Sequence, residues 1–183
     1  GLVAGYYGGR LDDLLMRVGD VQLAFPALVL AIAVLAVVGS GLANVVLVLG
    51  VTGWVTYARI ARAEALSLRH REFVESARAL GARDSAILWR HVLPNVLPPL
   101  VVVATFSVAR TIIAEAALSF RGLGLPPPTP SWGAMLDEGR NYITTGWWLA
   151  LFPGLAILAV VLGINLVGDW LRDLLDPRLE RSL

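Results

Sequence analysis

Four long stretches with little or no charge constrain the fold of this chain more than any other feature. They cover residues 21–39, 41–58, 96–120 and 146–168, and only the third contains charged residues, Arg110 and Glu115. Because a helix rises about 1.5 Å per residue, roughly 20 apolar residues cross a hydrocarbon core of about 30 Å. We therefore expect an all-α, polytopic transmembrane helical bundle with about four complete spans. A single large water-soluble helical core is the alternative.

The first nine residues predict the end of a further span. They are mostly apolar, and Gly1, Gly5 and Gly9 recur at every fourth position. In lipid, small residues at this spacing let helix backbones approach closely. We expect a chain truncated at its N-terminus, with a flexible glycine-rich terminus as the alternative.

The composition excludes several chemistries. The chain has no cysteine, which removes disulfides, thiolate metal sites and cysteine nucleophiles. All fifteen basic residues are arginine, so the lysine that ends a Walker-type phosphate loop is absent. His70 and His91 are not spaced as metal ligands, and no Gly-x-Ser-x-Gly motif occurs. We therefore expect no catalytic residue, no metal and no cofactor bound by this chain. The net charge of +1 also predicts no nucleic-acid partner.

The arginines are divided unequally between the two sides of the predicted spans. Segments 10–20, 59–95 and 169–183 share one side and hold twelve, whereas the other side holds only Arg121 and Arg140. The twelve are Arg10, Arg17, Arg59, Arg62, Arg69, Arg71, Arg78, Arg83, Arg90, Arg172, Arg178 and Arg181. Arginine-rich loops remain in the cytosol. We therefore expect residues 59–95 to be cytosolic and residues 121–145 to be external or periplasmic.

The cytosolic segment predicts two helices joined by a glycine turn. Residues 62–80 form an amphipathic pattern, and Gly81 stands where a helix end favours a left-handed residue. The apolar face would comprise Leu66, Phe73, Ala77 and Leu80.

The second helix is expected over residues 86–92. Asp84 or Ser85 can cap it, and Pro94 would end it. The result is either a compact elbow between two spans or an amphipathic hairpin lying on the membrane surface.

Residues 75–94 resemble the EAA loop of ABC-transporter permeases of the binding-protein-dependent import class. The matching positions are Glu75, Ala77, Gly81, Leu93 and Pro94, while Ser76 replaces an alanine and His91 an apolar residue. In that family the loop docks as a coupling helix into a cleft of an ATPase subunit. The resemblance implies that residues 62–94 are the cytosolic coupling loop. The implied ATPase-coupling residues are Glu75, Ser76, Ala77, Gly81, Leu93 and Pro94.

The resemblance extends along the chain to the dipeptide/oligopeptide/nickel branch of these permeases. The motifs lie at residues 5–9, 24–26, 91–95, 114–120, 127–133 and 175–178, and they resemble the second of two permease subunits. This implies a type I importer fold, with residues 1–183 as one N-terminally truncated permease domain. It also implies a multi-pass protein of a bacterial or archaeal plasma membrane.

The function implied is import of dipeptides, oligopeptides or a similar small solute such as nickel. A second homologous permease would form the path with this chain in the lipid bilayer. Two cytosolic ATPase subunits would bind and hydrolyse ATP, and an extracytoplasmic binding protein would supply the solute. An ion-gradient-driven secondary transporter and a non-transport membrane assembly protein are the alternatives. The single intramembrane acid, Glu115, provides little basis for an ion relay.

Arg110 and Glu115 are candidates for the translocation path or its outer gate. Five residues apart on a helix, they point about 140° from each other, so they would not neutralise one another. An ionised side chain near mid-bilayer costs about 2.5–3.5 kcal/mol on insertion scales, which is why such residues usually face protein or water. A buried polar pair bridging helices is the alternative.

Prolines mark the outer segment and the spans. Residues 122–130 are rich in proline and predict a stiff, extended chain, after which Ser131 can cap a short helix through Tyr142. This segment could be an external docking surface for a binding protein or a plain connector. The prolines that interrupt or flank spans are Pro26, Pro98, Pro99 and Pro153.

Overall fold

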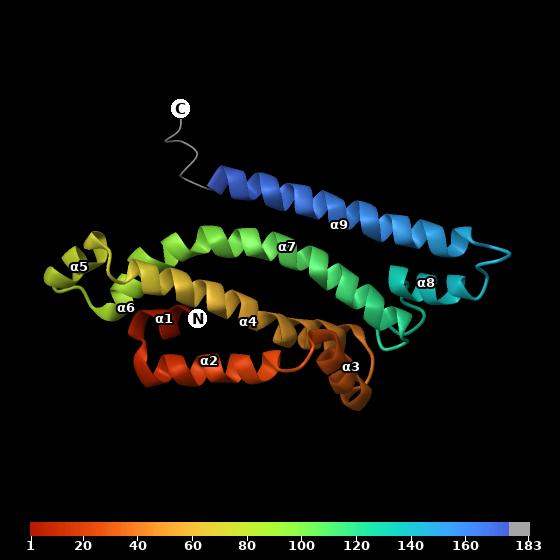
Figure 1. The fold of residues 1–183 in the computed structure, drawn as a ribbon, viewed down its shortest axis with the longest axis horizontal. Helices are drawn as coiled ribbons and strands as arrows, with labels where there is room; N and C mark the ends of the chain where they lie inside the picture. The colour runs from red at the N-terminus through yellow and green to blue at the C-terminus, as the bar shows by residue number, and fades with distance from the viewer. Residues whose placement is uncertain (176–183) are drawn as a thin grey trace. The chain divides into compact units, whose positions relative to one another are not determined.

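The computed structural model describes residues 1–175, which contain helices and no strand (Figure 1). The helices are α1 Leu2–Tyr7, α2 Gly9–Leu23, α3 Ala27–Val38, α4 Leu42–Leu68, α5 Glu72–Ala79, α6 Asp84–Ile87, the π-helix Leu88–Val92, α7 Leu93–Phe120, α8 Trp132–Arg140 and α9 Trp148–Leu175. The predicted all-α class is confirmed. Arg178, Arg181 and the motif positions after Leu175 lie outside the described residues.

Three described helices are long and apolar enough to cross a membrane: α4, the continuous helix Asp84–Phe120, and α9. The fourth predicted span, 21–39, is not one helix, because α2 ends at Leu23 and α3 begins only at Ala27. The chain is extended at Pro26, with φ −56° and ψ 126°. Proline disfavours the helical conformation at the residue before it, which explains the break at this point. The span count is four only if α2 and α3 together are counted as one span.

The described chain divides into two compact units, each with its own core. Unit 1 comprises Gly1–Ala24, Trp54–Ala104 and residues 171–175, and unit 2 comprises Phe25–Gly53 and Thr105–Trp170. The core of unit 1 consists of Tyr6, Ala61, Ala65, Val74, Ile87, Leu88, Val92 and Val96. The core of unit 2 consists of Ala31, Leu35, Val45, Val48 and Leu118.

In unit 1, α1 lies directly against the backbone of α4. A Cβ on Gly1 would overlap the carbonyl oxygen of Ala58, and one on Gly5 would lie 2.5 Å from that of Arg62. Close backbone approach is therefore confirmed for these two glycines. The same prediction is wrong for Gly9, which has open space around it and a φ of +62° at the start of α2.

Polar side chains join α2 to α4 within unit 1. The guanidinium of Arg62 donates two hydrogen bonds to the Asp12 carboxylate, at 2.5 and 2.6 Å. Further along, Trp54 Nε1 donates to Gln22 Oε1 at 2.8 Å. Rising numbers on α2 meet falling numbers on α4, so the two helices are antiparallel.

In unit 2, α8 packs on α7 through Gly133, where a Cβ would overlap the carbonyl of Ala116. Ser131 caps α8, since its Oγ accepts a hydrogen bond from Ala134 N at 3.1 Å. This cap was predicted correctly, although the helix ends at Arg140 rather than Tyr142.

The proline-rich segment before α8 is not the extended rod that its composition predicts. Thr129 N–H donates to the Pro126 carbonyl at 3.2 Å and closes a turn. The fixed φ of proline suits a turn as well as an extended helix, so composition alone did not decide between them.

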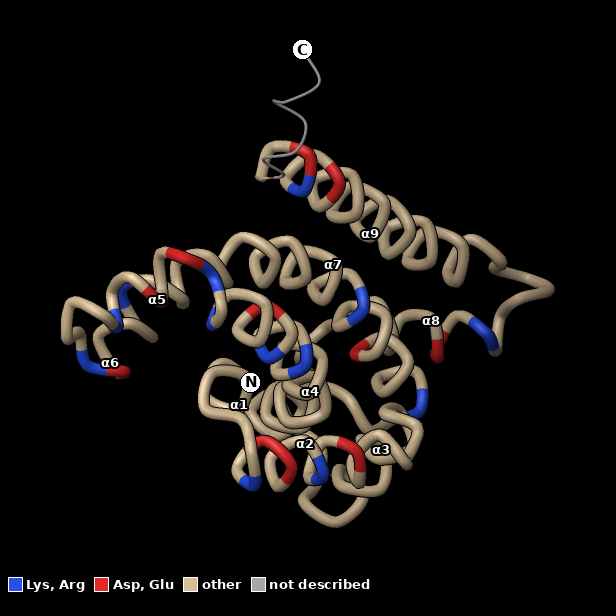
Figure 2. Tube along the Cα trace, turned by 60° about the vertical axis from the view of Figure 1, so that its left-hand side comes forward, with Lys and Arg blue, Asp and Glu red and all other residues tan. Residues whose placement is uncertain are grey.

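Charge is distributed unevenly along the helices. In Figure 2, α9 carries charged residues only near its C-terminal end. Unit 1 holds ten described arginines and unit 2 holds three, namely Arg110, Arg121 and Arg140. All described arginines predicted to be cytosolic therefore belong to unit 1.

Candidate functional site

The predicted glycine turn between α5 and α6 is present. Gly81 has a φ of +82°, a conformation that residues with a Cβ rarely adopt. Ala82 N–H donates to the Ala77 carbonyl at 3.1 Å, and Gly81 N–H donates to that of Arg78 at 3.0 Å. This pair of bonds is the Schellman ending of a helix. The turn, α5, α6 and the π-helix are together called the elbow below (residues 72–92). Its first arm is α5, and its second arm is α6 with the π-helix.

The first arm of the elbow is shorter than the helix predicted over residues 62–80. Helix α4 continues to Leu68, and α5 begins only at Glu72. At Arg71 the backbone is extended, with φ −78° and ψ 148°. The break lets Val74 enter the core of unit 1, where its side chain is fully buried.

The second arm begins without the predicted cap and continues past Pro94. No side chain caps α6, so the predictions for Asp84 and Ser85 are wrong. The helix runs without interruption from Asp84 to Phe120. Leu93 N–H donates to the Leu88 carbonyl five residues earlier. This wider π-turn relieves the clash of the Pro94 ring with the preceding turn, which explains why the helix does not end there.

The elbow brings together some of the predicted coupling residues. Glu75, Ser76 and Gly81 are exposed on α5 and its turn, and Ala77 is half-buried beside them. Leu93 and Pro94 lie apart from these residues in the chain, at the start of α7.

The predicted apolar face of α5 is only partly correct. Val74 and Ala77 pack inward, whereas Phe73 is 41% and Leu80 is 89% exposed. Phe73, Ser76 and Leu80 recur at helical spacing and form one outward stripe. An almost fully exposed leucine beside a turn with open space can make a contact with another protein.

Tyr6, Arg78 and Asp84 hold the elbow together through a contact that the sequence analysis did not predict. The Tyr6 hydroxyl donates to Asp84 Oδ1 at 2.8 Å, and Arg78 Nη2 donates to the same hydroxyl at 3.2 Å. The sequence held one signal for this contact, since Tyr6 lies within the glycine-rich segment 5–9. That segment was assigned only to a family motif.

His91, the departure from the EAA pattern, lies in the π-helix. Its Nδ1 is buried, and the structure gives it no hydrogen-bond partner among residues 1–175. A buried polar atom without a partner costs stability.

Glu115 lies in unit 2 and lines a groove of about 360 Å³. Ser119 Oγ donates to Glu115 Oε1 at 2.5 Å. The other lining residues are Leu125, Pro130, Ser131, Trp132 and Met135. Arg110 is exposed on the same helix, and no ion pair between it and Glu115 is present in the described part of the chain.

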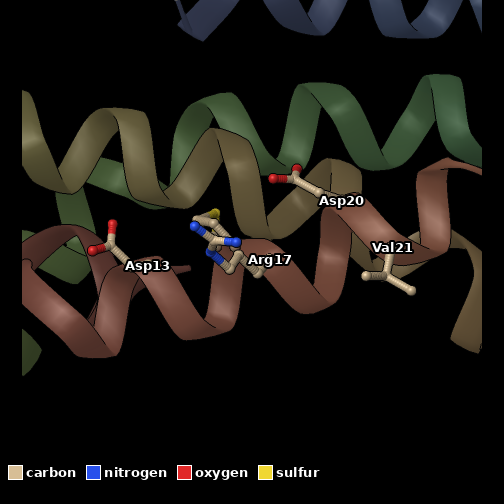
Figure 3. Close-up of a pocket in the computed structure, with 5 residues that line it drawn as sticks. Asp13, Arg17, Asp20 and Val21 are labelled. Carbon is tan, nitrogen blue, oxygen red and sulfur yellow. The ribbon is translucent and has the colours of Figure 1, made fainter.

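A second groove, of about 490 Å³, lies along α2 (Figure 3). Asp13, Arg17 and Asp20 follow one another along this surface. Asp20 also accepts a hydrogen bond from Arg59 of α4 at 2.7 Å. These residues form the charged flank of an amphipathic helix.

Comparison with known proteins agrees with these features. Residues 1–181 match the family described as binding-protein-dependent transport system inner membrane component. The glutathione transport system permease proteins of Shigella dysenteriae and Pectobacterium atrosepticum are 49% and 48% identical over 96% and 98% of this chain. The dipeptide transport system permease protein of Alkalihalophilus pseudofirmus is 43% identical over 98%.

The aligned residues cover 58%, 60% and 59% of those three relatives, so the chain spans about three fifths of their length. The names of these relatives confirm the resemblance to peptide-transport permeases. The apolar helices agree with a multi-pass membrane protein. This chain belongs to the family of binding-protein-dependent transport system inner membrane components.

Proposed function

We propose that the protein is a permease subunit of an ATP-driven importer of peptides or a similar small solute. The relatives named for dipeptide and glutathione transport support this substrate class, since glutathione is itself a small peptide. A second homologous permease completes the path, and an extracytoplasmic binding protein delivers the solute. Nickel remains a further candidate substrate from the sequence resemblance.

The elbow is the element that we assign to ATPase coupling. The observation that supports this is an exposed stripe, Phe73, Ser76 and Leu80, beside a glycine turn. Two cytosolic ATPase subunits bind and hydrolyse ATP, and one of them receives this stripe. Movement of the ATPases then reaches α7 directly, because α6 and α7 are parts of one continuous helix. Differential docking in two states is what makes such coupling allosteric.

Glu115 and Arg110 are assigned to the translocation path or its outer gate. The groove beside Glu115 combines one carboxylate with Trp132 and Met135, a surface that suits a positively charged solute with apolar parts. An ion-gradient-driven transporter is the rival function, and it requires no ATPase partner.

Substitutions at Gly81 test the coupling role. A Cβ at this position meets nothing within 4 Å in the chain itself, so a large side chain projects into open space. Gly81→Trp is expected to leave membrane insertion intact and to lower solute uptake per ATP hydrolysed by roughly tenfold, as for the loss of a contact worth about 1.4 kcal/mol. The measurement is uptake and ATP hydrolysis by the complete transporter in proteoliposomes.

Two control variants separate bulk from backbone strain at residue 81. Gly81→Ala introduces the strain of the left-handed conformation without bulk, and Gly81→Asn introduces a residue that tolerates this conformation. Both are expected to retain more coupling than Gly81→Trp. Equal coupling in Gly81→Trp and Gly81→Ala, at equal expression, would contradict a partner at this surface.

A further inference from the structure

The Tyr6 hydroxyl contacts both arms of the elbow at once. Arg78 precedes Gly81 on α5, and Asp84 follows it on α6. The hydroxyl accepts from Arg78 Nη2 at 3.2 Å and donates to Asp84 Oδ1 at 2.8 Å. One oxygen atom from the N-terminal segment therefore bridges the glycine turn.

The position of this hydroxyl is fixed by packing. The Tyr6 side chain belongs to the core of unit 1, and the residue is only 6% exposed. Helix α1 is in turn held on α4, because Gly1 and Gly5 lie against the backbone of Ala58 and Arg62. The packing of α1 thus holds the bridging oxygen in place relative to α4. The two groups that this oxygen joins belong to the elbow.

Apart from the contacts through Tyr6 and the core packing of Val74 and Ile87, the two arms are joined by a weak side-chain ion pair. Arg78 Nη2 and Asp84 Oδ1 are 3.8 Å apart, and their side chains are 55% and 52% exposed. Exposed ion pairs of this kind contribute little to stability. The backbone hydrogen bonds of the glycine turn lead back to Ala77 and Arg78 of α5 and do not reach α6. The hydrogen bonds through Tyr6 are therefore the main polar restraint on the angle between α5 and α6.

We propose that Tyr6 is a positioning residue of the coupling elbow, which fixes the angle between α5 and α6 through Arg78 and Asp84. The elbow then moves as one body with α4 and transmits displacement of α5 to α7. This inference rests on the proposed coupling function, since a fixed angle matters only if the elbow carries motion.

Tyr6→Phe in the complete transporter tests this role, because it keeps the buried ring and removes the bridging oxygen. Uptake per ATP hydrolysed is expected to fall roughly two- to tenfold, the range that follows from losing a net hydrogen bond. Tyr7→Phe is the matched control, since Tyr7 is 52% exposed and the structure gives its hydroxyl no bond within residues 1–175. This control is expected to couple as the parent does.

A distance measurement reports the elbow angle directly. Spin labels on cysteines at Glu72 and Ser85, both exposed, sample the separation of α5 and α6. The chain has no cysteine in residues 1–183, which keeps the labelling specific once any other cysteine of the full-length protein is replaced. Tyr6→Phe is expected to broaden the distance distribution, and Tyr7→Phe is expected to leave it unchanged.

Variants of Asp84 provide an independent check. Asp84→Asn retains an oxygen that accepts from Tyr6 and is expected to couple nearly as the parent does. Asp84→Ala is expected to lower uptake per ATP hydrolysed as much as Tyr6→Phe does. The double variant should lose little more than either single variant, as for partners in one interaction. Fully additive losses would overturn the proposal.

The outcomes separate this inference from the function on which it rests. If Gly81→Trp uncouples transport whereas Tyr6→Phe changes neither coupling nor the distance distribution, the role of Tyr6 is refuted and the coupling elbow stands. If Gly81→Trp has no more effect than Gly81→Ala, the coupling function itself fails.

Discussion

Glu115 is a residue whose charge and hydrogen bond can be tested separately. Its Oε1 accepts from Ser119 Oγ at 2.5 Å, and a glutamine oxygen can accept the same bond. Glu115→Gln therefore removes the charge and leaves the local bond in place. If the carboxylate faces a cationic solute, uptake should show a KM raised roughly two- to tenfold at unchanged expression and thermal stability.

Ser119→Ala is the control for Glu115, because it removes the hydrogen bond and retains the charge. A purely structural role predicts that Ser119→Ala lowers stability while Glu115→Gln leaves uptake unchanged. That pair of results would remove Glu115 from the proposed path.

At the residue scale, the sequence predicted positions whose conformation depends on immediate neighbours. Gly81 is such a position, since a glycine directly after a helical pattern predicts a left-handed ending. Ser131 is another, because a cap needs only the helix that follows it. The partners of Tyr6 could not be predicted in this way, since Arg78 and Asp84 are more than 70 residues away along the chain.

At the element scale, the length of a helix was easier to predict than its interruptions. The apolar run 96–120 corresponds closely to α7, but the run 21–39 conceals a break between α2 and α3. Hydropathy describes which residues favour lipid and contains no information about the direction of the chain. The continuation of a helix through Pro94 likewise depends on a π-turn that the amino-acid pattern does not reveal.

The packing of α2 on α4 provides a stability prediction at this scale. The Asp12 side chain is 9% and the Arg62 side chain 35% exposed, and two hydrogen bonds join them. Asp12→Asn keeps the shape of the side chain and removes its charge. The unfolding free energy is expected to fall by about 1–3 kcal/mol, because Arg62 loses a charged partner in a partly buried site.

Asp13→Asn is the matched control, since Asp13 is the adjacent residue and is exposed. It should change stability by less than about 0.5 kcal/mol, as surface substitutions usually do. Thermal unfolding of the purified protein in detergent measures both variants. Equal losses for the two would show that the Asp12–Arg62 pair does not hold α2 on α4.

At the scale of the whole molecule, the arginines provide the evidence for orientation. Unit 1 contains ten of the described arginines, including every one predicted to face the cytosol, and unit 2 contains three. Arginine at the centre of a membrane helix costs about 2.5–3.5 kcal/mol, and positively charged loops are retained in the cytosol. The elbow belongs to unit 1 and is therefore expected on the cytosolic side.

Accessibility of single cysteines from either side of the membrane tests this orientation. Ser76 on the elbow and Thr145 before α9 are both exposed, and cysteine is close to each in size. A membrane-impermeant maleimide should label Thr145→Cys in right-side-out membranes and Ser76→Cys only in inverted vesicles. Detergent-solubilised protein, in which both positions must react, is the control for reactivity. Labelling of Ser76→Cys from the outside would place the elbow where no cytosolic ATPase could bind it, and the coupling proposal would then be untenable even if transport required Gly81.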